Sequence, residues 1–327
     1  MKAWLLDGYH GIESIHLTEV ADPTAGPGEV LLKVRLAALN PADRYLAEAQ
    51  YPAKPKFPHI LGRECLGTIN AVGPGVVGWK PGDAALMLPG EIGSSRWGTF
   101  AEQVVVKADA LVPVPPGWSA EESAGAALVN LTAWQALTQW GELRAAVVLV
   151  TGASGGVGAA SLQLASALGH QVVALTRSDA KMEVLRRLGA AIVLNCTHPA
   201  WSKTLRQQLG SRGVDLAIDN IGGGLLPQVI ETLGMNGRVS LVGRLAGPVP
   251  QFNTASLFFK RLRLGGVAVS ASSLIDLRAD WEKLLHLLKV TAKRPIVDRV
   301  FAFEDLPAAF ARLYAGPIGK VLLAVAK

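Results

Sequence analysis

The feature that most constrains the fold of this chain is a strand, a glycine-rich turn and a helix in direct succession near its middle. The apolar, β-branched segment 147–150 stops at a turn of small residues, 151–158, and an alanine- and leucine-rich helical pattern follows. Such a turn directs the N–H groups of a helix N-terminus at a phosphate, as in dinucleotide-binding sites. A segment of domain length precedes the turn, and we expect that segment to determine which reaction the protein carries out.

Strand and helix patterns alternate after this turn. That alternation predicts right-handed βαβ crossovers and therefore a parallel sheet. The expected strands are 171–175, 191–194, 214–218 and 238–242, and the expected helices are 179–188, 200–209 and 225–233. The C-terminal part is expected to hold a helix (277–288), a strand (296–303), a short helix (306–314) and a last strand (320–325).

The first third of the chain has a different pattern, because residues 1–110 read as short strands broken by turns. The clearest strands are 30–36, 67–72 and 100–106. The proline-rich stretch 112–117 cannot continue a helix or a central strand, and we interpret it as a linker. Ser119 and Glu122 form a capping-box pattern, which predicts a helical segment that runs from there toward residue 140.

Composition limits the class of protein. Half of the residues are apolar, enough for a large core. No apolar run reaches the ~18 residues that a membrane span requires, and Asp7 interrupts the N-terminus too early for a signal peptide. The 2 cysteines form no disulfide framework. We therefore expect a cytoplasmic protein with no membrane partner.

The net charge of +6 suits an anionic ligand. Nucleic acid is also anionic, but the basic residues are scattered and form no polybasic run, so we do not expect nucleic-acid binding.

The glycine turn carries a variant of the dinucleotide fingerprint, with Ala153 in place of the first glycine. In this pattern Gly155 lets the backbone approach the phosphates, and Gly158 lets the helix pack on the strand. The strand before the turn and the βαβ pattern after it make a generic glycine-rich turn the weaker interpretation.

The end of the next strand indicates which nucleotide binds. An NAD site places an acid there, about 20 residues after the turn, to bind the ribose. This chain has Thr176, Arg177 and Ser178 instead, with Lys181 one turn on, and Asp179 is expected to open the next helix after a Ser178 cap. Hydroxyls and cations suit a 2′-phosphate, so we predict NADPH. The alternative is that Arg177 and Lys181 are solvated surface charges.

The turn also fits the short-chain dehydrogenases, but a second feature of that family is missing. Those enzymes need a Tyr-x-x-x-Lys pair, in which the lysine lowers the pKa of the tyrosine. The residues four positions after the tyrosines of this chain are Glu13, Ala49, Pro55 and Ile318. That family is therefore excluded.

Over essentially its whole length the chain resembles the medium-chain dehydrogenase/reductase superfamily, and within it the zinc-independent quinone oxidoreductase group. The segments that carry the resemblance are 38–43, 58–67, 73–83, 98–102, 131–134, 151–158, 219–222 and 319–323. The resemblance implies an α/β protein with a GroES-like, mostly-β catalytic domain (1–120 and 270–327) and a Rossmann, doubly wound cofactor domain (121–269). It also implies a homodimer, with the segment 265–269 as the candidate edge strand.

Two residues argue against zinc. Zinc enzymes of the superfamily carry cysteine where this chain has Asn40 and histidine where it has Arg63. An amide and a guanidinium cannot replace those ligands. His59 and Cys65 come nearest to a ligand pair, and we interpret them as packing residues. We predict no metal.

Without a zinc ion to polarise a carbonyl, the site suits an electrophile that accepts hydride readily, namely a quinone or an enone or enal. The resemblance implies that Asn40 lies near the nicotinamide ribose and substrate, that Tyr45 or Tyr51 lines the substrate pocket, and that Arg63 faces the cofactor. The alternatives are a turn role for Asn40, surface positions for both tyrosines and an ion pair between Arg63 and Glu64. No side chain stands out as the general acid, which leaves solvent or a ribose hydroxyl relay.

The resemblance also implies cofactor contacts, residue by residue. For the pyrophosphate they are Ser154, Gly155, Gly156, Val157 and Gly158; for the 2′-phosphate, Thr176, Arg177 and Lys181; and for the rest of the nucleotide, Thr132, Asn220, Val242, Gly243, Val267 and Val269. One departure concerns Asn195, which is followed by Cys196 where many relatives have a tyrosine near the adenosine phosphate.

Two other functions stay open. An enoyl-thioester reductase would need a longer channel and a basic patch for the carrier. A protein that binds NADPH without turnover would act as a sensor, a structural protein or an RNA-associated protein.

Overall fold

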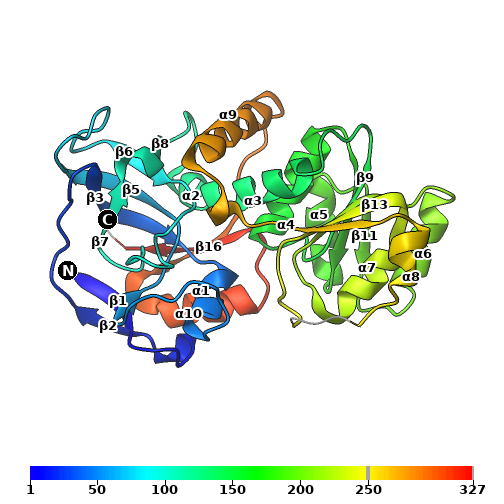
Figure 1. Cartoon of the computed structure of the whole chain (residues 1–327), viewed down its shortest axis with the longest axis horizontal. Helices are drawn as coiled ribbons and strands as arrows, with labels where there is room; N and C mark the ends of the chain where they lie inside the picture. Colours follow the sequence, from blue (N-terminus) through cyan, green and yellow to red (C-terminus); the bar gives the residue numbers. More distant parts are fainter. Residues whose placement is uncertain (248–250, 326–327) are drawn as a thin grey trace. The chain divides into compact units, whose positions relative to one another are not determined.

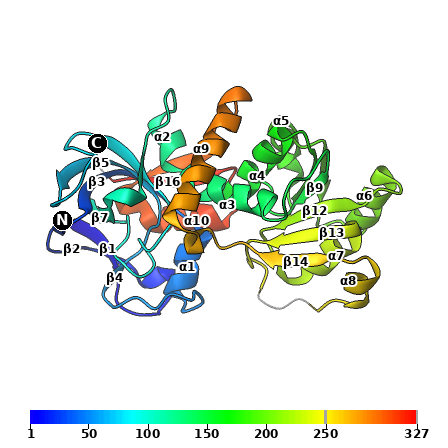
Figure 2. The ribbon, with the colours of Figure 1, turned by 45° about the horizontal axis from the view of Figure 1, so that its top comes forward.

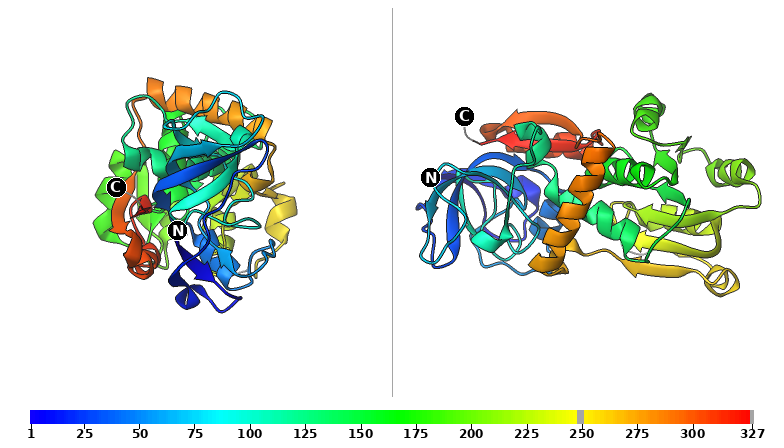
Figure 3. Two further views of the ribbon diagram at one scale, coloured as in Figure 1. Left: turned by 90° about the vertical axis from the view of Figure 1, so that its left-hand side faces the viewer. Right: turned by 90° about the horizontal axis from the view of Figure 1, so that it is seen from above.

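The structure, a computed structural model, describes residues 1–247 and 251–325 and falls into two compact units (Figure 1). The first unit comprises Met1–Leu128, Val269–Glu282 and Arg294–Lys327; the second comprises Val129–Ala268 and Lys283–Lys293. The first strand of the chain and the last therefore belong to the same unit (Figure 3). The units divide near the predicted domain boundaries, and the division into catalytic and cofactor domains stays a prediction.

The first unit is mostly β-structure. Its larger sheet has the order β15-β16-β3-β5-β6-β8, with β7 also paired to β3, and its smaller sheet has the order β2-β1-β4. All pairs are antiparallel except β15 with β16. The bounds are β1 Lys2–Leu6, β2 His16–Glu19, β3 Glu29–Ala38, β4 His59–Ile60, β5 Cys65–Val72, β6 Ala84–Met87, β7 Gln103–Lys107, β8 Leu111–Pro113, β15 Val297–Ala302 and β16 Lys320–Ala324.

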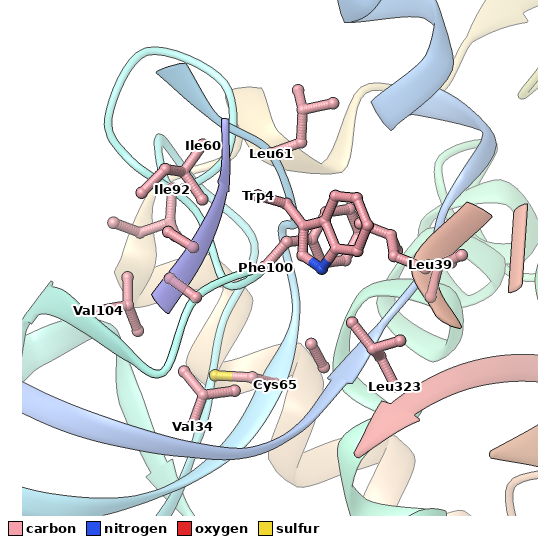
Figure 4. Close-up of a cluster of buried hydrophobic side chains, with 14 of the residues drawn as sticks. Trp4, Val34, Leu39, Ile60, Leu61, Cys65, Ile92, Phe100, Val104 and Leu323 are labelled. Atoms are coloured by element: carbon pink, nitrogen blue, oxygen red, sulfur yellow. The ribbon is translucent and has the colours of Figure 1, made fainter. Parts of the chain in front are cut away.

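A single apolar core holds the segment that carries the candidate catalytic residues. Trp4 of β1, Leu61, Phe100 and Leu323 of β16 converge in it (Figure 4). Backbone hydrogen bonds then join the chain after β4 to the segment around Phe100: the N–H of Phe100 donates to the Leu61 carbonyl at 3.0 Å. Packing and backbone pairing therefore fix the chain just before Arg63.

The second unit is built on a six-stranded sheet in which every neighbouring pair is parallel (Figure 2). The order β11-β10-β9-β12-β13-β14 is that of a doubly wound dinucleotide-binding fold. Strand β9 is buried along its whole length, as expected of a central parallel strand with both faces covered. The bounds are β9 Val147–Val150, β10 Gln171–Thr176, β11 Ile192–Asn195, β12 Val214–Asp219, β13 Leu233–Leu241 and β14 Arg263–Gly266.

Ten α-helices connect these strands in the described part of the chain. Their bounds are α1 Pro41–Ala47, α2 Ala120–Ala124, α3 Ala127–Thr138, α4 Gly156–Ala167, α5 Met182–Arg187, α6 Trp201–Leu209, α7 Leu226–Thr232, α8 Ala255–Phe259, α9 Leu274–Val290 and α10 Leu306–Tyr314. Among the described residues, no helix combines the length and the apolar character needed to cross a membrane.

The predicted α/β fold class, with a mostly-β part and a doubly wound parallel sheet, is confirmed, and most predicted elements lie within a few residues of the observed ones. Some local expectations were wrong. Helix α1 interrupts the region expected to hold only strands, with Pro41 in its first turn, where no N–H is needed. Strand β8 extends into the expected linker, because a proline is tolerated at the edge of a sheet.

Two more boundaries differ from the prediction. The helical segment after Ser119 is two helices that separate at Gly125, where a Cβ atom would lie 2.9 Å from Cγ of Lys320. The close approach of β16 thus explains the glycine at this position. The segment 265–269 is not one strand, since β14 ends at Gly266 and a 3-10 turn starts at Val269.

Candidate active site

The carboxyl ends of the parallel strands bring most of the predicted cofactor residues to one edge of the second-unit sheet. Doubly wound sheets bind ligands at this edge, where the strand order reverses. The reversal here lies between β10, β9 and β12, since β9 pairs with both of the others. The residues that end or follow the strands are Thr151, Thr176, Asn195, Asn220, Val242 with Gly243, and Val267.

The turn between β9 and α4 has the shape that a phosphate needs. A Cβ atom on Gly158 would lie 2.2 Å from the Gly152 carbonyl oxygen, so only glycine fits where α4 meets the turn. A Cβ atom on Gly155 would meet only the same oxygen, at 3.5 Å, which leaves the other side of the turn open. The first turn of a helix offers N–H groups to an external acceptor. The segment from Ser154 to Gly158 therefore fits the pyrophosphate of a dinucleotide.

A buried hydrogen-bond network ties this turn to the end of β12. The Thr151 hydroxyl donates to Oδ1 of Asp219 at 2.7 Å and accepts from the N–H of Asn220 at 2.9 Å. Nδ2 of Asn220 donates to the Thr151 carbonyl at 2.8 Å. Oδ1 of Asn220 is buried without a hydrogen-bond partner among the described residues, which marks a place for a donor group of a bound ligand.

Asp219 lies in a segment that carries the family resemblance, but no site role was predicted for it. It is fully buried and also accepts from the N–H groups of Ile221 and Gly222, at 3.2 and 3.1 Å. The sequence pattern that could have identified Asp219 is an acid at the end of a strand, followed by a glycine-containing turn. Its partner Thr151 could not be identified, because the contact joins strands far apart in the sequence.

The end of β10 presents the residues predicted to bind a 2′-phosphate. Nζ of Lys181 donates to the Ser154 hydroxyl at 3.1 Å, so this cation lies against the glycine turn. Thr176 is 6% exposed, while Arg177 is exposed to solvent. The structure thus brings Lys181 to the glycine turn, and Arg177 stands on the surface beside the strand end.

The acid near this strand end is engaged within the protein. Nδ2 of Asn195 donates to Oδ1 of Asp179 at 2.9 Å. Asp179 opens the 3-10 turn Asp179–Lys181, as its predicted role at a helix start required. Ser178 occupies the expected N-cap position, but its side chain makes no capping hydrogen bond. Its own N–H donates to the Thr176 hydroxyl at 3.1 Å.

Three further predicted residues lie elsewhere. Thr132 lies in α3 and is 6% exposed. Val267 follows β14 in the second unit, whereas Val269 begins the turn Val269–Ala271 and groups with the first unit. The predicted pair of valines is therefore divided between the two units.

In the first unit, a cluster of buried polar side chains surrounds the start of α1. Lys320 of β16 is 3% exposed, and its Nζ lies 3.0 Å from the Leu39 carbonyl, 2.7 Å from Oδ1 of Asn40 and 3.0 Å from Oε2 of Glu64. Three acceptors thus surround an ammonium group that has three N–H donors. The alternative of an ion pair between Arg63 and Glu64 was wrong, because Glu64 pairs with Lys320.

Asn40 is held inside this cluster. It precedes α1 as its N-cap residue, and its N–H donates to Oδ2 of Asp43 at 2.8 Å. Its side chain donates to the Ala38 carbonyl at 3.2 Å and accepts from Lys320. These contacts give Asn40 a structural role at the helix start, and its predicted role toward the nicotinamide ribose stays a prediction.

Asp43 and Arg63 form a second buried pair in the cluster. Nε of Arg63 lies 3.7 Å from Oδ1 of Asp43, and the two side chains are 6% and 0% exposed. Burial raises the pKa of Asp43 to about 6, although the charge of Arg63 and a hydrogen bond from the Asn40 backbone oppose the increase. The ionisation of this carboxyl therefore changes near neutral pH.

Of the two predicted tyrosines, the structure brings Tyr51 to Arg63. The guanidinium carbon of Arg63 lies 4.0 Å from the centroid of the Tyr51 ring, a cation–π distance. The Tyr51 ring is half-buried against the core. Tyr45 lies in α1, and its hydroxyl is buried. Tyr51 is therefore not an isolated surface aromatic.

The described residues contain no group of three or more histidine, cysteine, aspartate or glutamate side chains placed to hold a metal ion. His59 and Cys65, the nearest candidates in the sequence, are both 1% exposed. Burial raises the pKa of the Cys65 thiol to about 12 and lowers the pKa of His59 to about 4. Sγ of Cys65 lies 3.7 Å from Sδ of Met87, as expected of a packing residue.

Comparisons with known proteins identify the family. Residues 26–116 match the family described as alcohol dehydrogenase GroES-like domain, and residues 156–290 match the family described as zinc-binding dehydrogenase. An acryloyl-coenzyme A reductase of Metallosphaera sedula is 30% identical, with 99% of each chain covered. A quinone oxidoreductase of Sus scrofa is 27% identical, with 94% of this chain and 92% of the relative covered.

Solved structures agree with this assignment. A crystal structure of an NAD-dependent alcohol dehydrogenase has a TM-score of 0.91 and 30% identity, with 100% of each chain covered. A mycobacterial protein solved in complex with NADPH has a TM-score of 0.90 and 27% identity, with 99% of this chain and 100% of that chain covered. The chain therefore belongs to the medium-chain dehydrogenase/reductase superfamily, in its quinone oxidoreductase-like group, and is an oxidoreductase with an NAD(P)-dependent dehydrogenase fold that acts on a small molecule.

Proposed function

We propose that this enzyme is an NADPH-dependent, zinc-independent reductase of quinones or α,β-unsaturated carbonyl compounds. The observation that carries the proposal is the cluster around Asn40 and Arg63. At these two positions, where zinc enzymes of the superfamily hold their metal, the chain has an amide bonded to Lys320 and a guanidinium beside Asp43. Neither group is a zinc ligand, so the substrate must accept hydride without a Lewis acid.

The second unit supplies the groups that would hold the nucleotide. The turn from Ser154 to Gly158 would bind the pyrophosphate, and Asn220, Val242 and Gly243 would line the edge of the sheet. Lys181, already against the turn, would bind the 2′-phosphate with Thr176 and Arg177. Thr132, Val267 and Val269 would contact the nicotinamide portion. The reduced nucleotide supplies hydride when bound.

The first unit supplies the groups that would act on the substrate. Reduction of a quinone or an enone develops negative charge on oxygen, which hydrogen-bond donors must stabilise. Arg63 and Tyr51 are such donors and lie together, while the Tyr45 hydroxyl is buried. Asn40 would contact the substrate or ribose through its remaining hydrogen-bonding capacity. Tyr51 is therefore our candidate for the substrate pocket.

Assays of substrate reduction test this proposal. NADPH consumption is followed with 9,10-phenanthrenequinone, 1,4-benzoquinone, a 2-alkenal and crotonyl-CoA. Turnover of a quinone or of the alkenal supports the reductase. Tight NADPH binding with no turnover of any of the four would favour a protein that binds the nucleotide without catalysis.

Nucleotide titrations test the choice of NADPH. We expect tighter binding of NADPH than of NADH, and we expect Lys181→Ala to weaken NADPH binding while it leaves NADH binding nearly unchanged. Lys203→Ala, a change in a solvent-exposed lysine of α6, is the matched control. Equal affinity for the two nucleotides in the wild-type enzyme would remove the proposed 2′-phosphate site.

An enoyl-thioester reductase is the second candidate, favoured by a cavity of about 570 Å³ in the first unit. Its lining includes Lys54 and Lys56, cations that suit the phosphates of a coenzyme A carrier, and also Glu29 and Arg96, which pair with each other at 2.8 Å. The named relative from Metallosphaera sedula acts on such a thioester. Lys54→Glu with Lys56→Glu should raise KM for crotonyl-CoA and leave KM for the alkenal unchanged. Equal effects on both substrates would reject the carrier site.

We also propose a homodimer formed through the edge of the parallel sheet at β14. Phe258 and Phe259 of α8 are 64% and 72% exposed, and their ring centroids lie 4.3 Å apart. Exposed aromatic pairs are typical of protein interfaces. Light scattering should give twice the chain mass for the wild-type protein and a smaller mass for Phe258→Ser/Phe259→Ser. A monomeric wild-type protein would reject the dimer.

The proposed compartment is the cytoplasm. Cys65 and Cys196 are both free thiols, and neither is exposed, as suits a reducing compartment that also supplies NADPH. Cell fractionation followed by immunoblotting with an antibody to the protein tests the cytoplasmic location. Recovery of the protein outside the cytoplasmic fraction would contradict that location.

A further inference from the structure

The cavity of about 570 Å³ in the first unit is within the size range of small-molecule sites. All the residues that line it lie between positions 23 and 105 and therefore belong to the first unit. No predicted NADPH contact and no candidate catalytic residue is among these described lining residues. The cavity therefore offers a ligand a set of groups other than those proposed to hold the pyridine nucleotide.

His59 gives the lining of this cavity a buried polar group with an unused nitrogen. The side chain is 1% exposed, and Nε2 has no hydrogen-bond partner among the described residues. Burial lowers the pKa of His59 to about 4, although a hydrogen bond with the Gly93 backbone opposes the decrease, so the ring is neutral at physiological pH. A neutral imidazole has one N–H donor and one acceptor nitrogen. Because the Gly93 hydrogen bond favours the protonated ring, it uses the N–H, and Nε2 is left as an acceptor for a donor group of a ligand.

Two aromatic side chains in the lining offer surfaces to a flat ligand. Trp97 is 37% exposed, and its Nε1 donates to the Pro58 carbonyl at 3.0 Å, which fixes the orientation of the indole ring. Phe57 is held by an edge contact with Tyr9, in which the ring centroids lie 4.8 Å apart. Nucleobases stack on aromatic side chains of this kind. The cavity therefore suits a ligand with a flat heteroaromatic ring.

The charges of the lining favour an anion. Among the described lining residues Glu29 is the only carboxylate, and it is paired with Arg96 at 2.8 Å. Lys54 and Lys56 have no carboxylate within ion-pair distance among the described residues. Nζ of Lys54 lies 5.3 Å from the centroid of the Tyr9 ring, a cation–π contact that restrains this side chain. Two lysines without counter-ions suit the phosphate groups of a ligand.

We propose that this cavity is a second nucleotide site and binds a phosphorylated adenine nucleotide. The base would stack on Trp97, its exocyclic amino group would donate to Nε2 of His59, and the phosphates would bind Lys54 and Lys56. An inorganic anion would leave the aromatic surfaces and His59 unused, and a neutral aromatic compound would leave the lysines unused.

This ligand chemistry has two possible sources. One is the phosphorylated adenosine of a coenzyme A carrier, in which case the inference rests on the second candidate function and names the part of the carrier that the cavity holds. The other is a free adenine nucleotide that regulates the enzyme, in which case the site is independent of the substrate.

Titration calorimetry tests the site without turnover. The protein is first saturated with NADP⁺, which occupies the proposed pyridine-nucleotide site, and is then titrated with adenosine 3′,5′-bisphosphate. We expect one further nucleotide to bind per chain, and to bind about tenfold more weakly in Lys54→Glu/Lys56→Glu, which loses the charge-assisted phosphate contacts. Lys203→Glu, in the exposed lysine of α6, is the control and should bind like the wild type. No binding to the saturated wild-type protein, or equal affinity in both variants, would overturn the site.

A change in the ligand tests His59 and leaves the protein unaltered. AMP and purine riboside 5′-monophosphate differ only in the exocyclic amino group, and both are titrated with NADP⁺ present. AMP should bind about fivefold more tightly, as expected for one hydrogen bond. Trp97→Ala should weaken both ligands about tenfold through loss of stacking. Equal affinities for the two ligands would overturn the contact with His59 and, with it, the choice of adenine.

Steady-state kinetics at saturating NADPH distinguishes the two sources. If adenosine 3′,5′-bisphosphate raises KM for crotonyl-CoA and leaves the alkenal reaction unchanged, the site holds the carrier. If it changes kcat or KM for the alkenal, the site holds a free regulatory nucleotide. No effect on either reaction at a concentration that fills the site would overturn its role in this enzyme. If the enzyme turns over no substrate at all, the proposed function fails, whereas the binding experiments still decide whether the cavity holds an adenine nucleotide.

Discussion

Nζ of Lys320 lies 3.0 Å from Oε2 of Glu64, in an ion pair whose side chains are 4% and 2% exposed. The pair joins β16 to the segment before β5, and Oε1 of Glu64 also accepts from the N–H of Leu128 at 2.9 Å. Removal of one member would leave a buried charge without its partner, which costs more than the pair itself contributes. The region around Asn40 and Arg63 therefore depends on this pair for its shape.

Glu64→Gln should lower the free energy of unfolding by about 3–5 kcal/mol, because Lys320 would remain buried without a counter-ion. Lys320→Met should have an effect of similar size, and the double variant should lose less than the sum of the two. Urea denaturation measures all three. Glu183→Gln, in the exposed pair with Arg187 at 3.5 Å, is the control and should change stability by less than about 1 kcal/mol. Equal losses at both pairs would contradict the buried role.

Asp43 should make the stability of the protein depend on pH with an unusual sign. Its pKa in the folded state, about 6, lies above its ordinary value of 3.8. The folded protein therefore holds the proton more tightly, and this group's contribution to stability falls as pH rises from about 4 to about 6, by roughly 3 kcal/mol. Asp43→Asn has no such titration, so its stability relative to the wild type should rise over that range. A constant difference across the range would contradict the prediction.

Asp298 offers the control with the opposite sign. Burial alone would raise the pKa of Asp298, but hydrogen bonds from Arg312, at 2.6 and 2.7 Å, and from the Ile318 N–H lower it overall. Its contribution to stability is present above its unfolded pKa and is lost as pH falls. Asp298→Asn should therefore lose stability relative to the wild type as pH rises.

Alanine substitutions in the glycine turn should separate packing from nucleotide binding. Gly158→Ala should lower stability by about 1–3 kcal/mol, because its Cβ atom would overlap the Gly152 carbonyl. Gly155→Ala should fold like the wild type but bind NADPH about tenfold more weakly, equivalent to about 1.4 kcal/mol. Gly224→Ala, with no atom within 4 Å of the new Cβ, is the control. Fluorescence titration and thermal unfolding measure the two properties, and unchanged NADPH binding in Gly155→Ala would contradict the pyrophosphate site.

Thr151→Val should cost about 1–3 kcal/mol of stability, since Asp219 would lose a buried hydrogen-bond donor. Thr151→Ser keeps the hydroxyl and should recover most of the loss. Denaturant unfolding measures the free energy of unfolding of both variants. A valine variant as stable as the wild type would contradict the prediction, because valine keeps the methyl group and lacks only the hydroxyl that bonds Asp219.

The sequence predicted the second unit well because its signals are local. Buried β-branched strands, amphipathic helices and the glycine turn all repeat at short spacing, and parallel order follows from that alternation. Helix α1 was also predictable in principle, since Asn40, Pro41 and Asp43 form an N-cap, a first-turn proline and a first-turn acid. The family pattern around these residues obscured that signal.

The polar cluster of the first unit could not be predicted in the same way. Lys320 reaches Asn40 and Glu64 from the far end of the sequence, and only the pairing of β16 with β3 brings it there. Arg63 stands next to Glu64 in the sequence, which suggested a pair. Successive residues of an extended segment point in opposite directions, so the two side chains find different partners.

Deuterium transfer from the nicotinamide to a conjugated aldehyde tests the proposed reaction most directly. Enzyme treated with a chelator is incubated with NADPH carrying two deuterium atoms at C4 and with trans-2-hexenal, and mass spectrometry and NMR locate the label. We predict saturated hexanal with a single deuterium at the β-carbon. An allylic alcohol labelled at the carbonyl carbon, or an enal left unreduced by enzyme that binds NADPH and reduces no quinone, would contradict the proposal.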